Sequence, residues 1–293
     1  MEVRFRMRGL VFKHLTKADE LRKIEELQKE VWGMMDVEVV PTHMLVAIVM
    51  AGGVAIGAFD ENGEMVGFVF GLPGVRDGKL IHHSHMLGVK PGLRHGGIGY
   101  RLKLLQREAA IKQGVKLVEW TFDPLQGPNA KLNFAKLGVI SRTYFCDVYG
   151  EIRDSINIGY PSDRFLAEWW VKSPRVVKRL SGEFKPPVSS VLLSKGAETA
   201  IEVTDGEPVA KKSFSSKMVV LPIPEDINKL RKEKPELAYK WRMVTREAFE
   251  RLFSQGYIAT DFSSERRGEE RKNAYILIKA SLDEILSGEK LWR

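Results

Sequence analysis

Apolar and polar positions follow two periods along the first half of the chain. Apolar residues three or four positions apart predict an amphipathic helix whose buried face is Leu21, Ile24, Leu27 and Val31. Thr16 and Asp19 predict a capping box for this helix. Runs of strand length lie at 9–15, 53–72, 79–89, 116–122 and 141–150, and short helices are predicted at 41–50 and 127–139. Asn62-Gly63 makes the second run a hairpin.

The second half carries fewer signals. Ser162 precedes an apolar run that contains Phe165, Trp169 and Trp170, for which we expect a helix capped by the serine. A long amphipathic helix that ends at Gly256 is predicted from Leu237, Trp241, Val244, Ala248 and Leu252. Strands are predicted at 216–224, 257–263 and 274–281. Helices and strands are therefore mixed in this half too.

Three glycines, Gly96, Gly97 and Gly99, stand where a predicted strand passes into a predicted helix. A helix N-terminus carries backbone N–H groups without intrahelical partners and the positive end of the helix dipole. Glycine has no Cβ to hold a ligand away from those amides, so the backbone offers a seat for a phosphate. The alternative is a helix start that only packs close to the sheet, and the glycines alone leave both interpretations open.

The spacing in this loop excludes two common phosphate-binding loops. A P-loop ends in Gly-Lys-Ser/Thr, whereas Gly99 is followed by Tyr100 and Arg101, and the dinucleotide pattern G-x-G-x-x-G is not present. The loop instead reads R-x-x-G-x-G from Arg94 to Gly99, after Val-Lys-Pro. This pattern resembles motif A of the GNAT superfamily of CoA-dependent N-acyltransferases, in which the loop amides hold the CoA pyrophosphate.

The order of elements over 9–150 is also similar to the GNAT order of strand, two helices, three strands, motif helix, strand, helix and strand pair. Ala130, Phe134, Lys136 and Gly138 resemble its late helix motif. The resemblance implies an α/β (α+β mixed sheet) GNAT fold, with an acyl-CoA-binding domain at 1–150 and a C-terminal α/β domain at 151–293. The later part resembles a GNAT subgroup with a C-terminal extension. Whether it extends the sheet or forms a second, degenerate GNAT-like half stays open, and we expect it to cover the acceptor cleft.

The resemblance further implies a set of residues for acetyl-CoA or another acyl-CoA. The loop contributes Arg94, His95, Gly96, Gly97, Ile98, Gly99 and Tyr100. The main chain of Leu87 and Val89 is expected to pair with pantetheine. Asn129 is expected either to hydrogen-bond the cofactor or to cap its helix, and Phe134 to pack near the pantetheine or within the core.

The base is expected on the strand before the loop. Several GNAT members use a carboxylate there, and the position counted back from Arg94 is His83. Histidine titrates near neutral pH and accepts a proton from an ammonium or a water. Strand alternation puts His85 on the same face. Both are catalytic candidates, and the alternative for each is a histidine satisfied within the fold or placed for substrate hydrogen bonding.

The proton donor is less clearly marked. The GNAT tyrosine that hydrogen-bonds the CoA sulfur corresponds to Phe134, which has no proton to donate. Tyr144, Cys146 or a water is therefore expected in that role, and the alternative is a thiolate that leaves without a specific donor. Farther along, Asp163, Arg164 and Glu168 are expected either to contact the acceptor or to form a local salt bridge on a capped helix.

Composition limits the partners. The net charge of +8 is spread over interleaved basic and acidic residues, which is typical of a solvated mixed surface, and nucleic acid is not expected. The single cysteine, Cys146, suits the cytoplasm. No apolar run is long enough to span a bilayer and no signal-peptide pattern opens the chain, so no membrane association is expected. The histidines at 82–85 have no acidic or cysteine neighbour to complete a metal site.

The GNAT resemblance implies an N-acyltransferase, with acetyl as the first acyl group to test, that uses direct attack in a ternary complex. The acceptor is an amine on a small molecule or a protein. The alternative is a CoA-binding sensor or interaction protein that has lost catalysis, which Phe134 and the missing carboxylate favour. A homodimer is left open.

Overall fold

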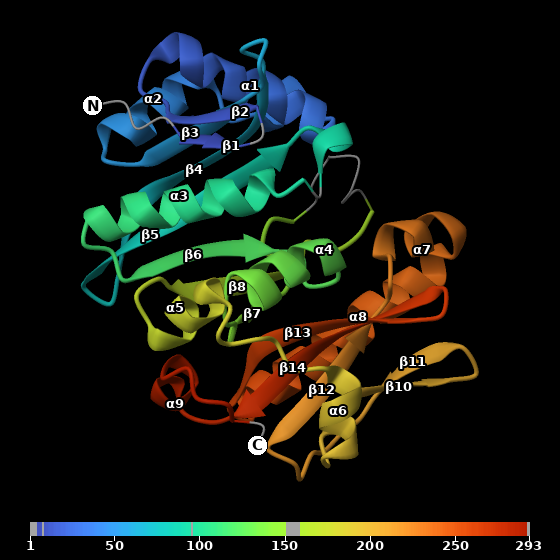
Figure 1. Ribbon diagram of the computed structural model, residues 1–293. Helices are drawn as coiled ribbons and strands as arrows, with labels where there is room; N and C mark the ends of the chain where they lie inside the picture. Colours follow the sequence, from blue (N-terminus) through green and yellow to red (C-terminus); the bar gives the residue numbers. More distant parts are fainter. Residues whose placement is uncertain (1–4, 8, 95, 151–158, 292–293) are drawn as a thin grey trace. The chain divides into compact units, whose positions relative to one another are not determined.

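The computed structural model describes residues 5–7, 9–94, 96–150 and 159–291. Among these residues, drawn in colour in Figure 1, the chain forms two compact units, the first of 5–120 with Gly159 and the second of 121–150 with 160–291. Residues 121–150 therefore group with the later part of the chain, and the division into domains at residue 150 stays a prediction.

The first unit is built on strands in the order β1-β2-β3-β4-β5-β6. Their bounds are β1 (Phe5–Met7), β2 (Leu10–His14), β3 (Val54–Phe59), β4 (Met65–Arg76), β5 (Lys79–Val89) and β6 (Leu117–Phe122). Neighbours from β1 to β5 are antiparallel, whereas β5 and β6 are parallel because α3 (Ile98–Lys112) connects them. The last two residues of β6 belong to the second unit.

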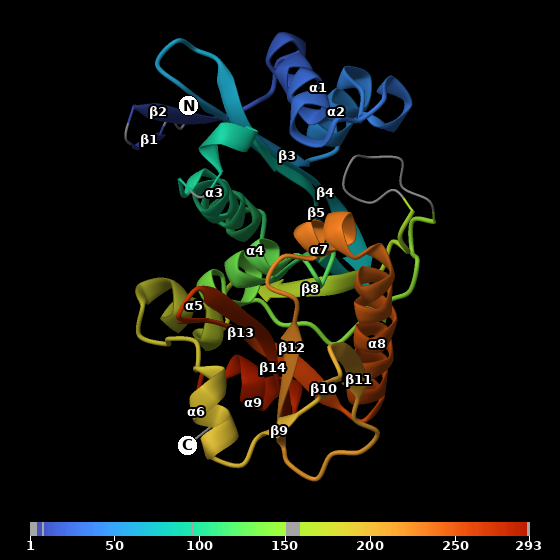
Figure 2. The ribbon, with the colours of Figure 1, turned by 90° about the vertical axis from the view of Figure 1, so that its right-hand side faces the viewer.

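Helices cover both faces of this sheet (Figure 2). α1 (Ala18–Trp32) and α2 (Thr42–Met50) pack on one face, with η1 (Asp36–Glu38) between them, and α3 packs on the other. The four apolar residues predicted for the α1 face are all buried. The predicted capping box is wrong, because the helix begins one residue later with Lys17 at the N-cap. The Glu20 carboxylate instead accepts a hydrogen bond from the Lys13 ammonium at 2.6 Å, and its other oxygen lies 3.5 Å from the Thr16 backbone nitrogen.

Among the described residues, no single helix is long and apolar enough to cross a bilayer. The segments Ala18–Trp32 and Asp36–Met50 reach the length and apolar composition of a membrane span only when they are taken together, and the chain bends by 120° between them. Several residues of both segments belong to the hydrophobic core of the first unit.

A β-bulge lies in the middle of the β4–β5 ladder. Phe70 pairs with Met86 and Gly71 pairs with Ser84, so His85 is the extra residue. A bulge shifts the alternation of a strand by one residue. We therefore expect even-numbered side chains of β5 to face α3 before the bulge and odd-numbered ones to face it after the bulge.

Contacts with α3 confirm this shift. Before the bulge, Ser84 accepts a hydrogen bond from Lys103 of α3. After the bulge, the side chains of Leu87 and Val89 lie under Gly99 of the same helix, 3.6 and 3.8 Å from where its Cβ would be. Simple alternation from His83 would have turned Leu87 and Val89 to the other face.

The strands β5 and β6 run side by side only at their first residues. Ile81 pairs with Leu117, His82 with Val118 and His83 with Glu119, and the registered pairing ends there. All residues of both strands are described, and the β5 edge from Ser84 to Val89 has no register with β6. We call this parting of the strands after the His83–Glu119 pair the fork.

The second unit holds the sheet β13-β14-β12-β9, the strand pair β8-β7 and the hairpin β10-β11. The strands are β7 (Tyr144–Phe145), β8 (Arg164–Trp170), β9 (Glu198–Thr199), β10 (Ile201–Thr204), β11 (Glu207–Ala210), β12 (Met218–Ile223), β13 (Tyr257–Arg267) and β14 (Glu270–Lys279). The helices are α4 (Gly127–Ala130), the π-helical turn η3 (Lys131–Lys136), α5 (Pro174–Ser181), α6 (Ser189–Ser194), α7 (Ile227–Glu233), α8 (Pro235–Ser254) and α9 (Leu282–Leu286). The three predicted strands and the long helix before Gly256 are confirmed. The strand expected at 141–150 shrinks to β7.

The helix expected after Ser162 is wrong, because this segment is strand β8. Six of its seven residues are buried, so both of its faces are covered and its apolar run has no helical period. Ser162 does not cap a helix, since its hydroxyl donates to Asp147 and accepts from the Tyr149 N–H. The serine cap comes later, where Ser173 accepts from Val176 at the start of α5.

The order β2-α1-α2-β3-β4-β5-α3-β6 is the order that the GNAT resemblance implied, and the mixed α/β fold class is confirmed. The Gly-rich stretch stands between β5 and α3, preceded by the 3-10 turn η2 (Pro91–Leu93). The predicted helix at 127–139 is also present, as α4 continued by η3.

Gly71 is predicted to be essential for the bulge. A Cβ at this position would lie 2.8 Å from the Ser84 Cα and would overlap the His83 carbonyl and the His82 ring. Gly71→Ala is expected to lower the free energy of unfolding by about 1–3 kcal/mol, measured by urea denaturation. Gly92→Ala is the control, because no atom lies within 4 Å of its added Cβ. Equal stability of the two variants would contradict this account of the bulge.

Candidate functional site

An imidazole and a carboxylate stand at the vertex of the fork. His83 of β5 and Glu119 of β6 are paired residues, and the His83 Nδ1 lies 3.7 Å from the Glu119 Oε1. The same oxygen accepts a hydrogen bond from the Arg76 Nη2 at 2.9 Å. The His83 side chain is 31% exposed, so a solute reaches it, whereas the Glu119 side chain is 3% exposed.

The second oxygen of Glu119 is buried and has no hydrogen-bond partner among the described residues. A buried carboxylate oxygen without a donor is costly, and such oxygens in native proteins mark places where a ligand or water donates. Sequence reasoning missed Glu119. The sequence does mark it, because Glu119 is the one acidic residue in the apolar run 117–122. That mark points to a site only once the strand register places Glu119 opposite His83.

His85 shares the face of His83, as the sequence predicted. The two ring centroids lie 6.2 Å apart, and the His85 ring lies 5.5 Å from that of Phe70. Desolvation, and then the neighbouring His83, lowers the pKa of His85 below its ordinary value. His85 is therefore a neutral imidazole near pH 7, able to accept a proton or a hydrogen bond.

The opposite face of β5 carries a buried polar network. The Lys103 ammonium donates to the Ser84 Oγ at 2.7 Å and to the Gln106 Oε1 at 3.2 Å, and it lies 3.6 Å from the Trp120 ring centroid. The Gln106 amide contacts the His82 Nε2 at 3.1 Å. Burial lowers the pKa of Lys103 well below its usual value. None of these residues was singled out from the sequence, because their proximity depends on the packing of α3.

The glycine loop forms an uncapped helix N-terminus. Gly97 is the N-cap of α3 with φ of 88°, no side chain caps the helix, and its first turn has no acidic residue. The first helical bond joins the Arg101 N–H to the Gly97 carbonyl, so the amides of Ile98 and Gly99 precede the helical ladder. No atom lies within 4 Å of where a Gly97 Cβ would be. These residues fit a phosphate group.

The side chains of the other loop residues predicted to bind CoA do not share one environment. The exposed Arg94 donates from Nη2 to the Val31 carbonyl at 3.1 Å, near the end of α1. The Ile98 side chain is buried in the core, so only its backbone faces a ligand. Burial raises the pKa of Tyr100. His95 lies outside the described residues.

Three predicted residues belong to the second unit. Phe134 has no exposed surface and its ring lies 5.4 Å from that of Tyr275, which is the core alternative. Asn129 is exposed, and Gln126 holds the N-cap position of α4, so the capping alternative is wrong. The Tyr144 hydroxyl donates to Asp163 at 2.7 Å, and burial raises its pKa. The cofactor roles of Asn129 and Phe134 and the catalytic role of Tyr144 stay predictions.

Arg164 and Glu168, which are both described residues, do not form the local salt bridge that was one of the two expectations for them. Arg164 donates to the Asp163 carbonyl at 2.9 Å, and Glu168 accepts from the Arg142 Nε at 2.8 Å. The reason is the strand, since residues four apart in a strand are separated by about 13 Å. Asp163 is buried and accepts two hydrogen bonds from Arg246.

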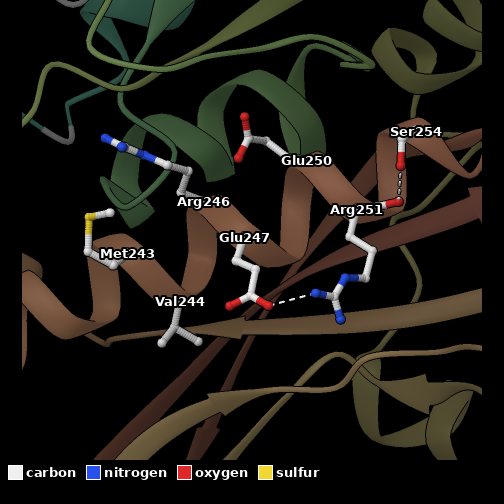
Figure 3. Close-up of a pocket in the computed structure, with 7 residues that line it drawn as sticks. All are labelled: Met243, Val244, Arg246, Glu247, Glu250, Arg251 and Ser254. Atoms are coloured by element: carbon white, nitrogen blue, oxygen red, sulfur yellow. Dashed lines mark hydrogen bonds and ion pairs between the residues drawn. The ribbon is translucent and has the colours of Figure 1, made fainter.

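A hollow of about 670 Å³ lies along α8 in the second unit (Figure 3). It is lined by Met243, Val244, Arg246, Glu247, Glu250, Arg251 and Ser254. Arg251 donates to Glu247 at 2.6 Å, whereas the Arg246 side chain points away from this pair (Figure 3). Nearby, Cys146 donates to Glu250 at 3.1 Å, and burial raises the pKa of its thiol to about 11. No predicted cofactor or catalytic residue lines this hollow, so we place the site at the fork.

Neither a protein-family model nor a curated protein sequence matches the chain. Solved structures of similar fold include the ribosomal-protein-S5-alanine acetyltransferase from Vibrio fischeri, with 15% sequence identity and a TM-score of 0.46 over 58% of this chain and 97% of that one. An acetyltransferase of the GNAT family from Streptococcus pneumoniae has 14% identity and a TM-score of 0.45 over 54% and 98%. Naa50 from Arabidopsis thaliana, in complex with the bisubstrate analogue CoA-Ac-MVNAL, has 15% identity and a TM-score of 0.44 over 55% and 97%.

Stability is predicted to depend on pH through His82. Burial, and then the charges of Lys103 and His83, lowers its pKa to about 4. Unfolding restores a pKa near ~6.5, so the unfolded chain binds the proton first as the pH falls. The contribution of neutral His82 is therefore complete above pH ~6.5, decreases as the pH falls below that value and is almost gone at pH about 4, a loss on the order of 3 kcal/mol. Urea denaturation between pH 7 and 4 should show a shallower pH dependence for His82→Gln, and parallel curves would contradict the assignment.

Proposed function

We propose that this chain is an N-acyltransferase that moves an acyl group, acetyl first of all, from acyl-CoA to an amine by direct attack. The observation that carries the proposal is the fork. An open strand edge runs from a glycine-built helix N-terminus to an accessible imidazole beside a buried carboxylate. This arrangement offers a phosphate seat, a surface for an extended arm and a base, in that order along β5.

The N-terminus of α3 is proposed to hold the pyrophosphate. The amides of Ile98 and Gly99 precede the helical ladder and point out of the helix end, where the dipole favours an anion. The guanidinium of Arg94 is engaged with the Val31 carbonyl, so the backbone rather than this side chain is the main phosphate contact. This revises the role that the sequence suggested for Arg94.

The open edge of β5 is proposed to bind the pantetheine arm as an added strand would bind. From Val89 back to Ser84 the edge measures ~17 Å, five residues at the usual rise of a strand. An extended arm held at this edge, with its phosphates at α3, places its thioester beside His83. The main chain of Leu87 and Val89 serves this purpose, because their side chains face α3.

His83 is proposed to remove the proton from the acceptor ammonium. The partly exposed imidazole is able to accept that proton, and the Glu119 carboxylate, with its Oε1 3.7 Å from the His83 Nδ1, stabilises the imidazolium that results. The unsatisfied oxygen of Glu119 is available to accept an N–H from the ammonium or from a water between them. Arg76 holds the other oxygen and fixes the carboxylate. The neutral amine then attacks the thioester carbonyl.

The acceptor is proposed to be an amine on a small molecule or a polypeptide. The test mixes the chain with acetyl-CoA and a panel of primary amines and follows the release of free thiol. His83→Ala is expected to lower kcat ~10²-fold or more with little change in CoA affinity, the usual scale for loss of a general base. Glu119→Gln keeps the shape and is expected to lower kcat less and to change the pH profile.

His43→Ala is the matched control, because His43 is an exposed histidine of α2 in the same unit. It should keep wild-type kinetics. Release of thiol by His83→Ala at the wild-type rate, with an unchanged pH profile, would place the base elsewhere. Absence of acetyl-CoA binding by the wild-type chain in calorimetry would overturn the proposed function itself.

A further inference from the structure

In the polar network on the α3 face of β5, each hydrogen bond has a defined donor and acceptor. The Lys103 ammonium has three hydrogens, and they are directed to the Ser84 Oγ, the Gln106 Oε1 and the Trp120 ring. Gln106 thus presents its oxygen to Lys103, and its amide group donates to the His82 Nε2. Every hydrogen of the ammonium is committed within the protein.

Ser84 is the member of this network with a proton to give. Its oxygen accepts from Lys103, so its own O–H must point to another acceptor, and no described residue accepts it. The side chain is 3% exposed, which makes an uncommitted hydroxyl hydrogen costly unless a ligand or water takes it. The hydroxyl is therefore held as a donor.

Ser84 also occupies a special place on β5. It is the first residue beyond the His83–Glu119 pair, at the start of the open edge. His83 and Ser84 are successive residues, so their side chains leave β5 on opposite faces. A thioester carbonyl lying at this edge would meet an imidazole on one side and a hydroxyl on the other.

We propose that Ser84 is the proton donor to the departing thiolate and that Lys103 is the positioning residue that orients and supports it. This inference rests on the proposed function. His83 first passes the proton of the acceptor ammonium to solvent. The neutral amine then forms a C–N bond to the carbonyl carbon, His83 takes the second amine proton, and the C–S bond breaks with its electron pair on sulfur. The Ser84 hydroxyl gives its proton to that sulfur, and Lys103 gives a proton to the serine oxygen. After CoA leaves, Lys103 regains a proton from solvent through the Ser84 hydroxyl.

The surroundings of Lys103 favour this transfer. No described carboxylate pairs with its ammonium, and its side chain is buried against Trp120. Burial without a counter-ion makes the ammonium a better acid than an exposed lysine. The arrangement supplies the donor that is missing at Phe134, which lies in the aromatic core of the second unit.

The test is Ser84→Ala, measured with acetyl-CoA and the best amine of the panel. We expect kcat to fall ~10²-fold, while the Kd for CoA in calorimetry stays near wild type. The melting temperature is expected to fall as well, because the buried Lys103 ammonium loses one acceptor, so kcat is measured well below it. Ser84→Cys keeps a proton donor of similar size and should recover much of the rate. Lys103→Met should lower kcat as well, and Lys112→Met, an exposed lysine at the end of the same helix, is its control.

The double variant Ser84→Ala/Lys103→Met separates a chemical role from a structural one. If Lys103 acts through Ser84, the double variant is no slower than Ser84→Ala alone. Independent, multiplicative losses would overturn the pairing, and wild-type kcat in Ser84→Ala would overturn the donor assignment. A wild-type chain that binds acetyl-CoA and releases thiol keeps the proposed function intact in either case, whereas failure to bind acetyl-CoA overturns both.

Discussion

The parting of β5 and β6 after the His83–Glu119 pair is the constraint on which the rest of the candidate site depends. Strands normally continue their ladder because unpaired backbone groups are costly. Here the bulge at His85 bends β5 at the point where pairing with β6 stops, and Gly71 leaves room for that bend. The free edge that results is where we propose that the pantetheine arm pairs with the backbone of β5.

The same bulge decides which side chains share a face. Up to the bulge, ordinary alternation puts His83 and His85 on one side and Ser84 in the buried network of α3 on the other. The bulge then turns Leu87 and Val89 under the helix, so that only their main chain is left for the edge. The His83 imidazole and the Ser84 hydroxyl thus flank the fork, and the N-terminus of α3 follows the far end of the open edge.

Sequence reasoning found what is local in the chain. The α1 face, the order of elements, the glycine loop and the shared face of His83 and His85 follow from short-range period and turn chemistry, and the structure has them. It missed Glu119, Ser84 and Lys103, because their meaning depends on strand register and on how α3 packs. It misread β8 as a helix, since a short strand buried on both faces has no alternation to distinguish it. The boundary predicted at residue 150 follows the extent of the resemblance, whereas the grouping of residues 121–150 with the second compact unit depends on long-range contacts that the sequence does not show.

The central claim is that the open edge of β5 and the start of α3 together receive CoA. Hydrogen–deuterium exchange of the whole chain, with and without CoA, measures this most directly because it reports on backbone amides. The account predicts slower exchange in peptides that cover 84–90 and 96–100 when CoA is present, with little change along α8. Unchanged exchange at both segments under saturating CoA, or protection confined to α8, would contradict it.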